Sequence, residues 1–329
     1  MNNSFRTEIN ISHNSIEITH KDSFMLIGSC FAEEIGKKLQ MGGFVVNINP
    51  FGILFNPQSI VNCLNRIVNR QYFVEDELDF FNNQWFSFLH HGSFAHEDKN
   101  TCLRQINQQI DDSFTYLSTT NYLVLTLGSA YAYWHKEKKY IVSNCHKLPQ
   151  QYFNRILLDV QTIEENLKAV LCQVKKINKQ ICIILTISPI RYVKYNLEEN
   201  MLSKSILKVA THHIINQDEQ VQYFPSYEIM MDDLRDYRFY QTDMIHPNET
   251  AVNYIWSKFS QHYFSVQTQQ IVDLIQEINR GKQHIIKNTN QEELQKFKQA
   301  MLKKIEQVKL LAPYLSLDIE EQYFNHIIE

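Results

Sequence analysis

The residues best suited to chemistry lie in two short segments far apart in the chain. The first is Gly28-Ser29-Cys30, which follows an apolar run and begins an amphipathic pattern. The amides and dipole of a helix N-terminus can lower the pKa of a thiol and hold an oxyanion. Ser29 and Cys30 are therefore candidate nucleophiles. A serine cap followed by a small buried cysteine is the commoner use of such a sequence.

The second segment is Asp243-Met244-Ile245-His246-Pro247. A carboxylate three residues before a histidine can contact the imidazole across one turn and fix its tautomer. The other ring nitrogen is then free to act as a general base. A nucleophile, a base and a carboxylate need to be adjacent in space and not in sequence. The two segments together predict a Cys/Ser-His-Asp triad made of Cys30 or Ser29, His246 and Asp243.

Apolar runs that alternate with helical patterns must position these residues. Such alternation, repeated about five times, predicts a parallel sheet with helices on both faces, a three-layer α/β/α sandwich. Ligands of such folds bind at the carboxyl ends of the strands. The predicted strands are 24–27, 44–46, 122–127, 181–187 and 221–224, and Gly28, Gly52, Gly128 and Ser188 stand at or just after strand ends.

Two of the predicted helices depend on sequence signals that the structure can test. Thr162 and Glu165 form the pattern of a capping box and predict a helix start at Thr162. A second helix near 201–215 carries Leu202, Ile206 and Val209, which predicts that this stripe is buried. Ser203-Lys204 then falls on the solvated face.

Glycine use also points to the first segment. The chain has 8 glycines in 329 residues, about a third of the usual share of roughly 7%. Five of the eight lie between residues 28 and 52. Because glycine serves where the backbone takes positive φ or another group approaches closely, we expect the site to be built there.

The composition suggests a main domain over 1–265 and a helical extension over 266–329. The region 70–110 is irregular and predicts an inserted hairpin or lid. After about residue 265 the sequence is rich in Gln, Lys and Glu with helical periodicity. The stripe expected to be buried in this extension is Leu294, Phe297, Met301, Ile305 and Val308.

Taken together, these segments resemble the SGNH/GDSL hydrolase superfamily. The string Gly28-Ser29-Cys30-Phe31-Ala32 resembles the signature of the GSCFA family within it. The resemblance implies a flavodoxin-like sheet and hydrolysis of an acyl ester without a cofactor. It assigns Asp243 and His246 to the last block of the superfamily. It assigns Gly52 to the second block, whose backbone amide faces the oxyanion.

Two blocks depart from the superfamily pattern. The third block, Gly-x-Asn, reads Gly128-Ser129-Ala130 here, so its oxyanion asparagine is missing. The first block, Gly-Asp-Ser, aligns Cys30 with the serine when no gap is allowed, and we favour Cys30 over Ser29 on that ground. The candidate substitutes for the missing oxyanion donor are Ser129, Asn49, Asn144, His91 and His146.

The predicted function is hydrolysis of an O-acyl ester, with an acylated carbohydrate as a candidate substrate. The alternatives are an acyltransferase and a non-catalytic protein that binds a glycan or acyl ligand in the same cleft. His91, Asn144, His146 and Arg191 are candidate substrate-binding residues. No His, Cys, Asp or Glu cluster has the spacing of a metal site, so we expect no metal and no cofactor.

Charge and hydropathy exclude several other classes. The formal net charge of −4 argues against a nucleic-acid partner or a basic membrane-surface protein. No apolar run reaches the length of about 18 residues that spans a bilayer. The first residues lack the apolar core of a signal peptide, and the six cysteines form no Cys-x-x-Cys pair, so we expect a cytoplasmic protein with free thiols. The oligomeric state stays open.

Overall fold

The computed structural model describes residues 7–11, 16–192, 196–283 and 291–326. The chain divides into two compact units, and each is described by itself. The first unit is formed by Met1–Ile11, Ser23–Gly36 and Val46–Ile255, and the second by Ser12–Asp22, Lys37–Val45 and Trp256–Glu329. In the described part of the chain, no helix is both long enough and apolar enough to cross a membrane.

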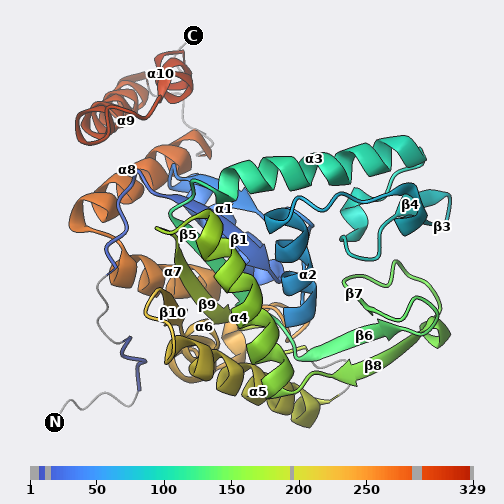
Figure 1. Ribbon diagram of the computed structural model, residues 1–329. Helices are drawn as coiled ribbons and strands as arrows, with labels where there is room; N and C mark the ends of the chain where they lie inside the picture. Colours follow the sequence, from blue (N-terminus) through green and yellow to red (C-terminus); the bar gives the residue numbers. More distant parts are fainter. Residues whose placement is uncertain (1–6, 12–15, 193–195, 284–290, 327–329) are drawn as a thin grey trace. The chain divides into compact units, whose positions relative to one another are not determined.

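A five-stranded sheet forms the centre of the first unit (Figure 1). Its order is β10-β9-β5-β1-β2, which is the flavodoxin-like order 2-1-3-4-5 when the five strands are counted along the chain. The pairs β1–β5, β5–β9 and β9–β10 are parallel. The strands are β1 (Ser23–Gly28), β2 (Val45–Ile48), β5 (Tyr122–Leu127), β9 (Cys182–Ile187) and β10 (Val221–Phe224).

Both faces of this sheet are buried, as expected of nearly continuous apolar strands. Met25 and Ile27 of β1 pack in one core cluster with apolar side chains of α2, α4 and α5, which cross one face in Figure 1. Phe24 and Leu26 point to the opposite face and are also fully buried. The predicted α/β class is confirmed. The helices are α1 (Cys30–Met41), α2 (Pro57–Val68), α3 (Lys99–Leu117), α4 (Val160–Ile177), α5 (Leu197–Ile215), α6 (Ser226–Glu228) and α7 (Glu249–Tyr263).

The start of α4 differs from the capping-box prediction. The helix begins at Val160, and its N-cap is Asp159, whose Oδ1 accepts the amide hydrogen of Thr162 at 2.8 Å. Thr162 therefore occupies the third helical position and donates to a cap. An aspartate carboxylate caps a helix as well as a threonine hydroxyl does. The sequence held both candidate caps, Asp159 and Thr162, and the helix begins after the first of them.

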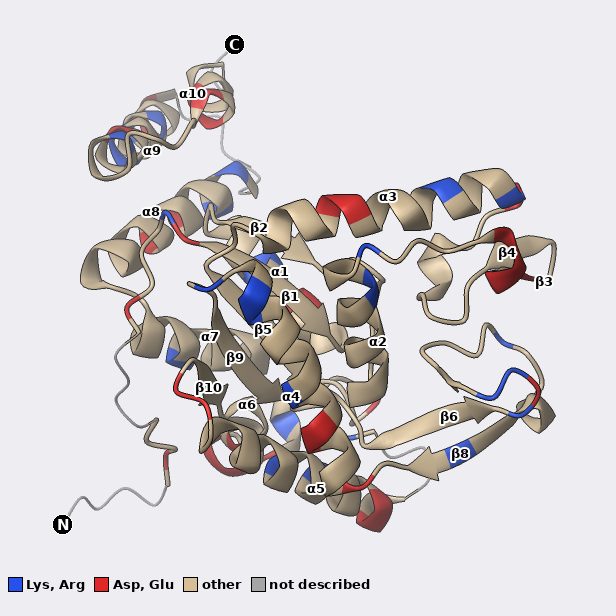
Figure 2. Ribbon diagram, in the orientation of Figure 1, with Lys and Arg blue, Asp and Glu red and all other residues tan. Residues whose placement is uncertain are grey.

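Two small antiparallel sheets extend from the first unit. The hairpin of β3 (Asp79–Phe81) and β4 (Gln84–Phe86) lies in the region 70–110. No strand was predicted for the second sheet, in which β6 (Tyr131–His135) pairs with β7 (Ile141–Val142) and β8 (Phe153–Leu157). Basic and acidic residues are interspersed along the ribbons of α3, α4 and α5 of this unit (Figure 2).

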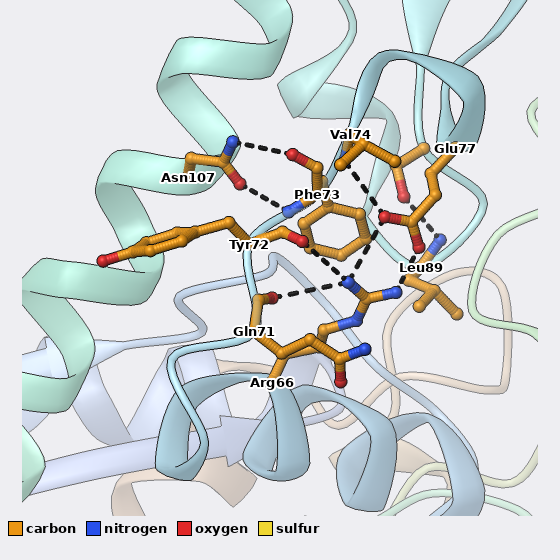
Figure 3. Close-up of polar contacts among 9 residues, drawn as sticks. Arg66, Gln71, Tyr72, Phe73, Val74, Glu77, Leu89 and Asn107 are labelled. Atoms are coloured by element: carbon orange, nitrogen blue, oxygen red, sulfur yellow. Dashed lines mark hydrogen bonds and ion pairs between the residues drawn. The ribbon is translucent and has the colours of Figure 1, made fainter.

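Arg66 of α2 anchors the segment that leads into this insertion (Figure 3). Its guanidinium donates to the carbonyl oxygens of Gln71 and Tyr72 and forms an ion pair with Glu77. From α3, the Asn107 side chain both accepts from the Phe73 amide and donates to the Phe73 carbonyl, at 2.8 and 3.0 Å. Side chains of two helices thus replace the strand partners that this extended segment lacks.

In the second unit, α8 (Val266–Gln283), α9 (Gln291–Leu311) and α10 (Asp318–Asn325) share an apolar cluster. Ile271, Ile275 and Ile278 of α8 pack in it against α9. Of the predicted stripe, Met301, Ile305 and Val308 are buried, and Phe297 packs at the margin of the cluster. Leu294 lies outside it and is partly exposed.

Candidate active site

The structure brings Cys30, His246 and Asp243 into one line of contacts within the first unit. Cys30 is the first residue of α1, and its Sγ lies 3.8 Å from His246 Nε2. On the other side of the ring, His246 Nδ1 lies 2.6 Å from Asp243 Oδ2. Thiol, imidazole and carboxylate therefore follow in the order that nucleophile activation requires.

The loop that carries His246 is shaped by Asp243. Asp243 Oδ1 accepts the backbone amides of Ile245 and His246 at 2.9 and 3.0 Å. These backbone bonds, together with the one to the imidazole, lower the pKa of Asp243 to about 2. The carboxylate is ionised at neutral pH and can only accept, so His246 Nδ1 carries the hydrogen. Nε2 is then left as an acceptor toward the thiol.

Ser29 is placed differently from Cys30. It is 2% exposed, and its Oγ accepts a hydrogen bond from the Phe31 amide at 3.3 Å. This is the interaction of an N-cap residue with the second residue of its helix. The contact with His246 is made by the neighbouring residue, Cys30.

The electrostatic environment of Cys30 differs from the sequence expectation. Burial raises the pKa of the thiol and outweighs the lowering by the amides of Cys30 and Phe31, while Glu33 and Glu34 raise it further. The helix N-terminus therefore does not produce a preformed thiolate, because loss of solvation disfavours the charged form. A base must remove the proton, and His246 is the neighbouring base.

Gly28 makes the turn from β1 into α1 possible. Its φ is +151°, and a Cβ at this position would overlap the carbonyl oxygen of Thr126, which lies opposite on β5. A residue with a side chain cannot take this conformation so close to the neighbouring strand. The close approach places Cys30 directly at the carboxyl edge of the sheet.

Two of the predicted oxyanion donors are engaged elsewhere. The Gly52 amide donates to the Asn49 carbonyl at 2.7 Å, inside a turn. The Ser129 amide donates to the Phe55 carbonyl at 2.9 Å. The Ser129 hydroxyl accepts the amide hydrogen of Tyr131 at 3.0 Å. In this conformation the backbone amides of Gly52 and Ser129 are not free to bind an oxyanion, because each already donates to a backbone carbonyl oxygen.

Asn49 offers a donor that these turns do not use. Its Oδ1 accepts the Gly28 amide at 2.9 Å, which places its side chain beside the end of β1. Because an amide N–H must meet an oxygen, this bond fixes which end of the carboxamide is Nδ2. Asn49 is 8% exposed, and its Nδ2 has no partner among the described residues.

The four candidate substrate-binding residues occupy different places. His91 lies against Gly52, where a Cβ on the glycine would overlap it. Arg191 is partly buried, and its Nε has no partner among the described residues. Asn144 Oδ1 accepts the His146 amide at 2.8 Å. His146 stacks on Phe86 at 4.0 Å, and burial lowers its pKa to about 4. Asn144 thus contacts His146, and His146 packs against Phe86 of the insertion, so both residues contribute to the packing there.

Ser203 and Lys204 are buried, whereas the sequence predicted that they lie on a solvated face. Both are 2% exposed. Ser203 Oγ accepts the Ala130 amide at 2.8 Å, and Lys204 Nζ donates to the carbonyls of Gly128 and Ser188 at 2.7 Å. Of the stripe predicted to be buried, Leu202 is 48% and Val209 is 44% exposed. The usable signal was the spacing of Leu207, Ala210 and Ile214, which Ser203 continues by one turn.

The fold and this line of contacts define an α/β protein with a Cys-His-Asp arrangement at the carboxyl edge of a parallel sheet. The model of the GSCFA family matches residues 23–259, and the chain belongs to this family. No curated protein matches the chain.

Several solved structures are similar at low sequence identity. One is the family 3 carbohydrate esterase of Clostridium thermocellum, with 10% identity and a TM-score of 0.36 over 77% of this chain and 98% of that chain. Another is an acetyl xylan esterase from the rumen bacterium Butyrivibrio proteoclasticus, with 9% identity and a TM-score of 0.40 over 74% of this chain and 64% of that chain.

Proposed function

We propose that this protein hydrolyses O-acyl esters through a thioester intermediate on Cys30. The observation that carries the proposal is the line of contacts from Cys30 Sγ to His246 Nε2 at 3.8 Å and from His246 Nδ1 to Asp243 Oδ2 at 2.6 Å. Nucleophiles are often somewhat farther from their base in unliganded sites than in the reacting complex. The resemblance of the Asp243 and His246 block to that of the SGNH hydrolases supports the same roles.

The proposed reaction has two acyl transfers. Cys30 Sγ attacks the ester carbonyl carbon as its proton passes to His246 Nε2, and the carbonyl oxygen becomes an oxyanion. The bond to the alcohol oxygen then breaks, and His246 gives this oxygen the proton, which leaves a thioester. In the second transfer His246 takes a proton from water, the water oxygen attacks the thioester, and the released thiolate regains its proton. Asp243 orients the imidazole and stabilises its charged form.

For the oxyanion we propose two donors, the backbone amide of Cys30 and Asn49 Nδ2. The Cys30 amide stands in the first turn of α1, where helix amides have no intrahelical acceptor. Asn49 would supply the side-chain donor that the third block of this chain lacks. Its support is the position beside Gly28 together with a buried, unpartnered amide nitrogen.

Asn49→Asp tests this role, because it keeps an oxygen for the Gly28 amide and removes the donor. We expect kcat for an activated acetyl ester to fall by about 100-fold or more with a smaller change in KM, as when a known hydrolase loses one such donor. The measurement is steady-state kinetics, with thermal unfolding to confirm folding. If Asn49→Asp retains its rate and Ser129→Ala loses it, the donor is Ser129.

The proposed substrate is a small O-acyl ester, with an acetylated carbohydrate as the candidate. Two alternatives are testable in the same assay: transfer of the acyl group to an alcohol other than water, and ligand binding without turnover. Arg191 and His91 are the proposed substrate contacts, because Arg191 Nε has no partner among the described residues and His91 lies against Gly52.

An ester panel decides among these functions. We expect the protein to release acetate from p-nitrophenyl acetate and from acetylated oligosaccharides, and His246→Ala to match the rate in buffer. Glycerol added as an acceptor distinguishes transfer from hydrolysis, because transfer yields glyceryl acetate in place of acetate. Saturable binding of an acetylated oligosaccharide with no turnover of any ester would contradict the hydrolase proposal and favour a binding protein.

A further inference from the structure

A pocket of about 550 Å³ opens between α2, the insertion and the loop 136–140, apart from the residues assigned to the reaction. Its volume is in the range of about 300–1,000 Å³ that is typical of small-molecule sites. One wall combines Leu89 and the Phe73 ring with the Arg66 guanidinium, whose Cζ lies 4.1 Å from the ring centroid (Figure 3). The pocket is therefore large enough for a ligand and has an apolar wall backed by polar groups.

The two cations that line the pocket are neutralised by carboxylates. Arg66 forms an ion pair with Glu77, and Lys138 Nζ lies 2.6 Å from Asp79 Oδ2. A further carboxylate, that of Asp76, also lines the pocket, but this residue is exposed and its charge is screened by solvent. Because no unpaired cation of the described residues faces the pocket, a phosphate, sulfate or carboxylate would find no partner of opposite charge. We therefore expect an uncharged ligand.

Two side-chain amides of α2 reach the pocket with one end unpartnered. Asn62 Oδ1 accepts from Gln58 Nε2 at 2.9 Å, and Gln58 Oε1 in turn accepts from Asn166 Nδ2 at 2.8 Å. Asn65 Oδ1 accepts from Gln173 Nε2 at 3.5 Å. The amides of α4 and α2 thus hold each asparagine by its oxygen. In the described part of the chain this leaves Nδ2 of Asn62 and of Asn65 without an acceptor.

Tyr140 adds a hydroxyl to the same pocket. Burial, together with the carboxylates of Asp79 and Glu77, raises the pKa of Tyr140 to about 12, so the hydroxyl keeps its proton at neutral pH. An apolar ligand would take these amides and this hydroxyl out of water without giving them hydrogen bonds, which is unfavourable. A ligand with several hydroxyl groups can satisfy them, since each hydroxyl both donates and accepts. These groups together fit an uncharged sugar.

The pocket adjoins a loop of the candidate active site. Ser87 and Leu89 line the pocket. His91 follows two residues after Leu89, donates its amide to the Phe51 carbonyl at 2.9 Å and lies against Gly52. Two residues of extended chain span at most about 7 Å. The pocket wall at Leu89 therefore lies within this distance of the backbone of His91, one of the proposed substrate contacts.

We propose that this pocket is a subsite for an uncharged sugar residue and holds the carbohydrate part of the substrate at a distance from the ester. Its use as a subsite rests on the proposed function, because that function supplies the ester at Cys30. The inference adds the class of substrate, a neutral acylated oligosaccharide. Binding of a sugar in the pocket does not itself depend on the reaction.

The test is isothermal titration calorimetry of the full chain with cellotetraose, xylotetraose and maltotetraose, none of which carries an ester. At least one of them should bind saturably, and more tightly than anionic tetragalacturonate or the cationic tetramer of glucosamine. In Asn62→Ala and in Tyr140→Phe we expect Kd to rise by about three- to tenfold, the effect of losing one hydrogen bond. The control Tyr72→Phe removes a hydroxyl that donates to Asp111 outside the pocket, and it should keep the wild-type Kd.

Three results would overturn the proposal: no saturable binding of any neutral tetrasaccharide, tighter binding of a charged one, or a Kd that changes as much in Tyr72→Phe as in the two pocket variants. If a pocket variant fails to fold, the site is located on the wild-type protein by hydrogen–deuterium exchange. The tetrasaccharide that binds most tightly should protect the segments 70–77 and 136–142. Protection of neither segment overturns the proposal.

Turnover tests the use of the subsite separately. We expect kcat/KM for an acetylated tetrasaccharide to exceed that for the acetylated monosaccharide, and Asn62→Ala to lower this ratio. Sugar binding by a protein that hydrolyses no ester would remove the hydrolase proposal and keep the sugar site. An active esterase that binds no neutral tetrasaccharide would remove only the subsite.

Discussion

Replacing Cys30 by alanine should lower kcat/KM for an activated acetyl ester by about a thousandfold or more, as loss of the nucleophile does in a known hydrolase. Cys30→Ser should retain little activity, because a hydroxyl is far less acidic than a thiol and His246 would have to activate it. Ser29→Ala should keep most of the activity and lose about 1 kcal/mol of stability, the usual contribution of a helix cap. The measurements are steady-state kinetics and thermal unfolding of each variant.

Covalent labelling provides the independent check on the nucleophile. Iodoacetamide should inactivate the wild-type protein by modifying Cys30, and this modification should slow in His246→Ala, since the imidazole removes the thiol proton. Labelling of Ser29 by a fluorophosphonate, with Ser29→Ala inactive and Cys30→Ala active, would show that Ser29 is the nucleophile. The protein would then be a serine esterase.

Asp243→Asn should lower kcat by about ten-thousandfold, the loss seen when a triad aspartate is replaced by asparagine in a known protease. An amide can donate to Nδ1 and so permits the wrong tautomer of His246, which leaves no acceptor toward the thiol. Asp236→Asn is the matched control. Asp236 is an exposed aspartate of the same chain segment that caps the turn 237–239 through the Arg238 amide.

The pKa of Asp243 predicts how the stability of the protein and the rate of Asp243→Asn depend on pH. Its pKa is lowered to about 2 in the folded protein, against about 3.9 in an unfolded chain. The carboxylate therefore stabilises the folded state above about pH 4, and this contribution is lost as the pH falls toward 2. Between pH 4 and 9 Asp243 does not titrate, so Asp243→Asn should be slow across this whole range. Recovery of its rate at any pH in this range would contradict the role.

The sequence was sufficient to predict the sheet because buried parallel strands are continuous apolar runs. The runs at 24–27, 122–127 and 181–187 correspond to β1, β5 and β9. Alternation of strands with helices predicts right-handed crossovers and leaves few possible strand orders. No prediction covered β6, β7 and β8. The residues of β6 and β8 are a mixture of aromatic, apolar and polar types without the simple alternation of a half-buried strand, and β7 is only two residues long.

The contact between Asp243 and His246 was also local enough to predict, since three residues separate them. The contact of His246 with Cys30 joins residues 216 positions apart. It exists because β1 and the loop before α7 meet at the same edge of the sheet. Which of two neighbouring residues faces the imidazole depends on how α1 begins: Ser29 caps the helix, so Cys30 carries the free side chain.

Only the tertiary structure decided which face of α5 is buried. It also decided that the amides of Gly52 and Ser129 donate to backbone carbonyl oxygens and not to a substrate. The helix has one stripe through Leu202 and Val209 and another through Leu207 and Ile214, and periodicity does not tell which one meets the sheet. A lysine gives no further guidance, because its long aliphatic stem suits a surface and an interior alike. Its burial was settled by two carbonyl oxygens at the ends of β5 and β9, which the fold brings within reach of Nζ.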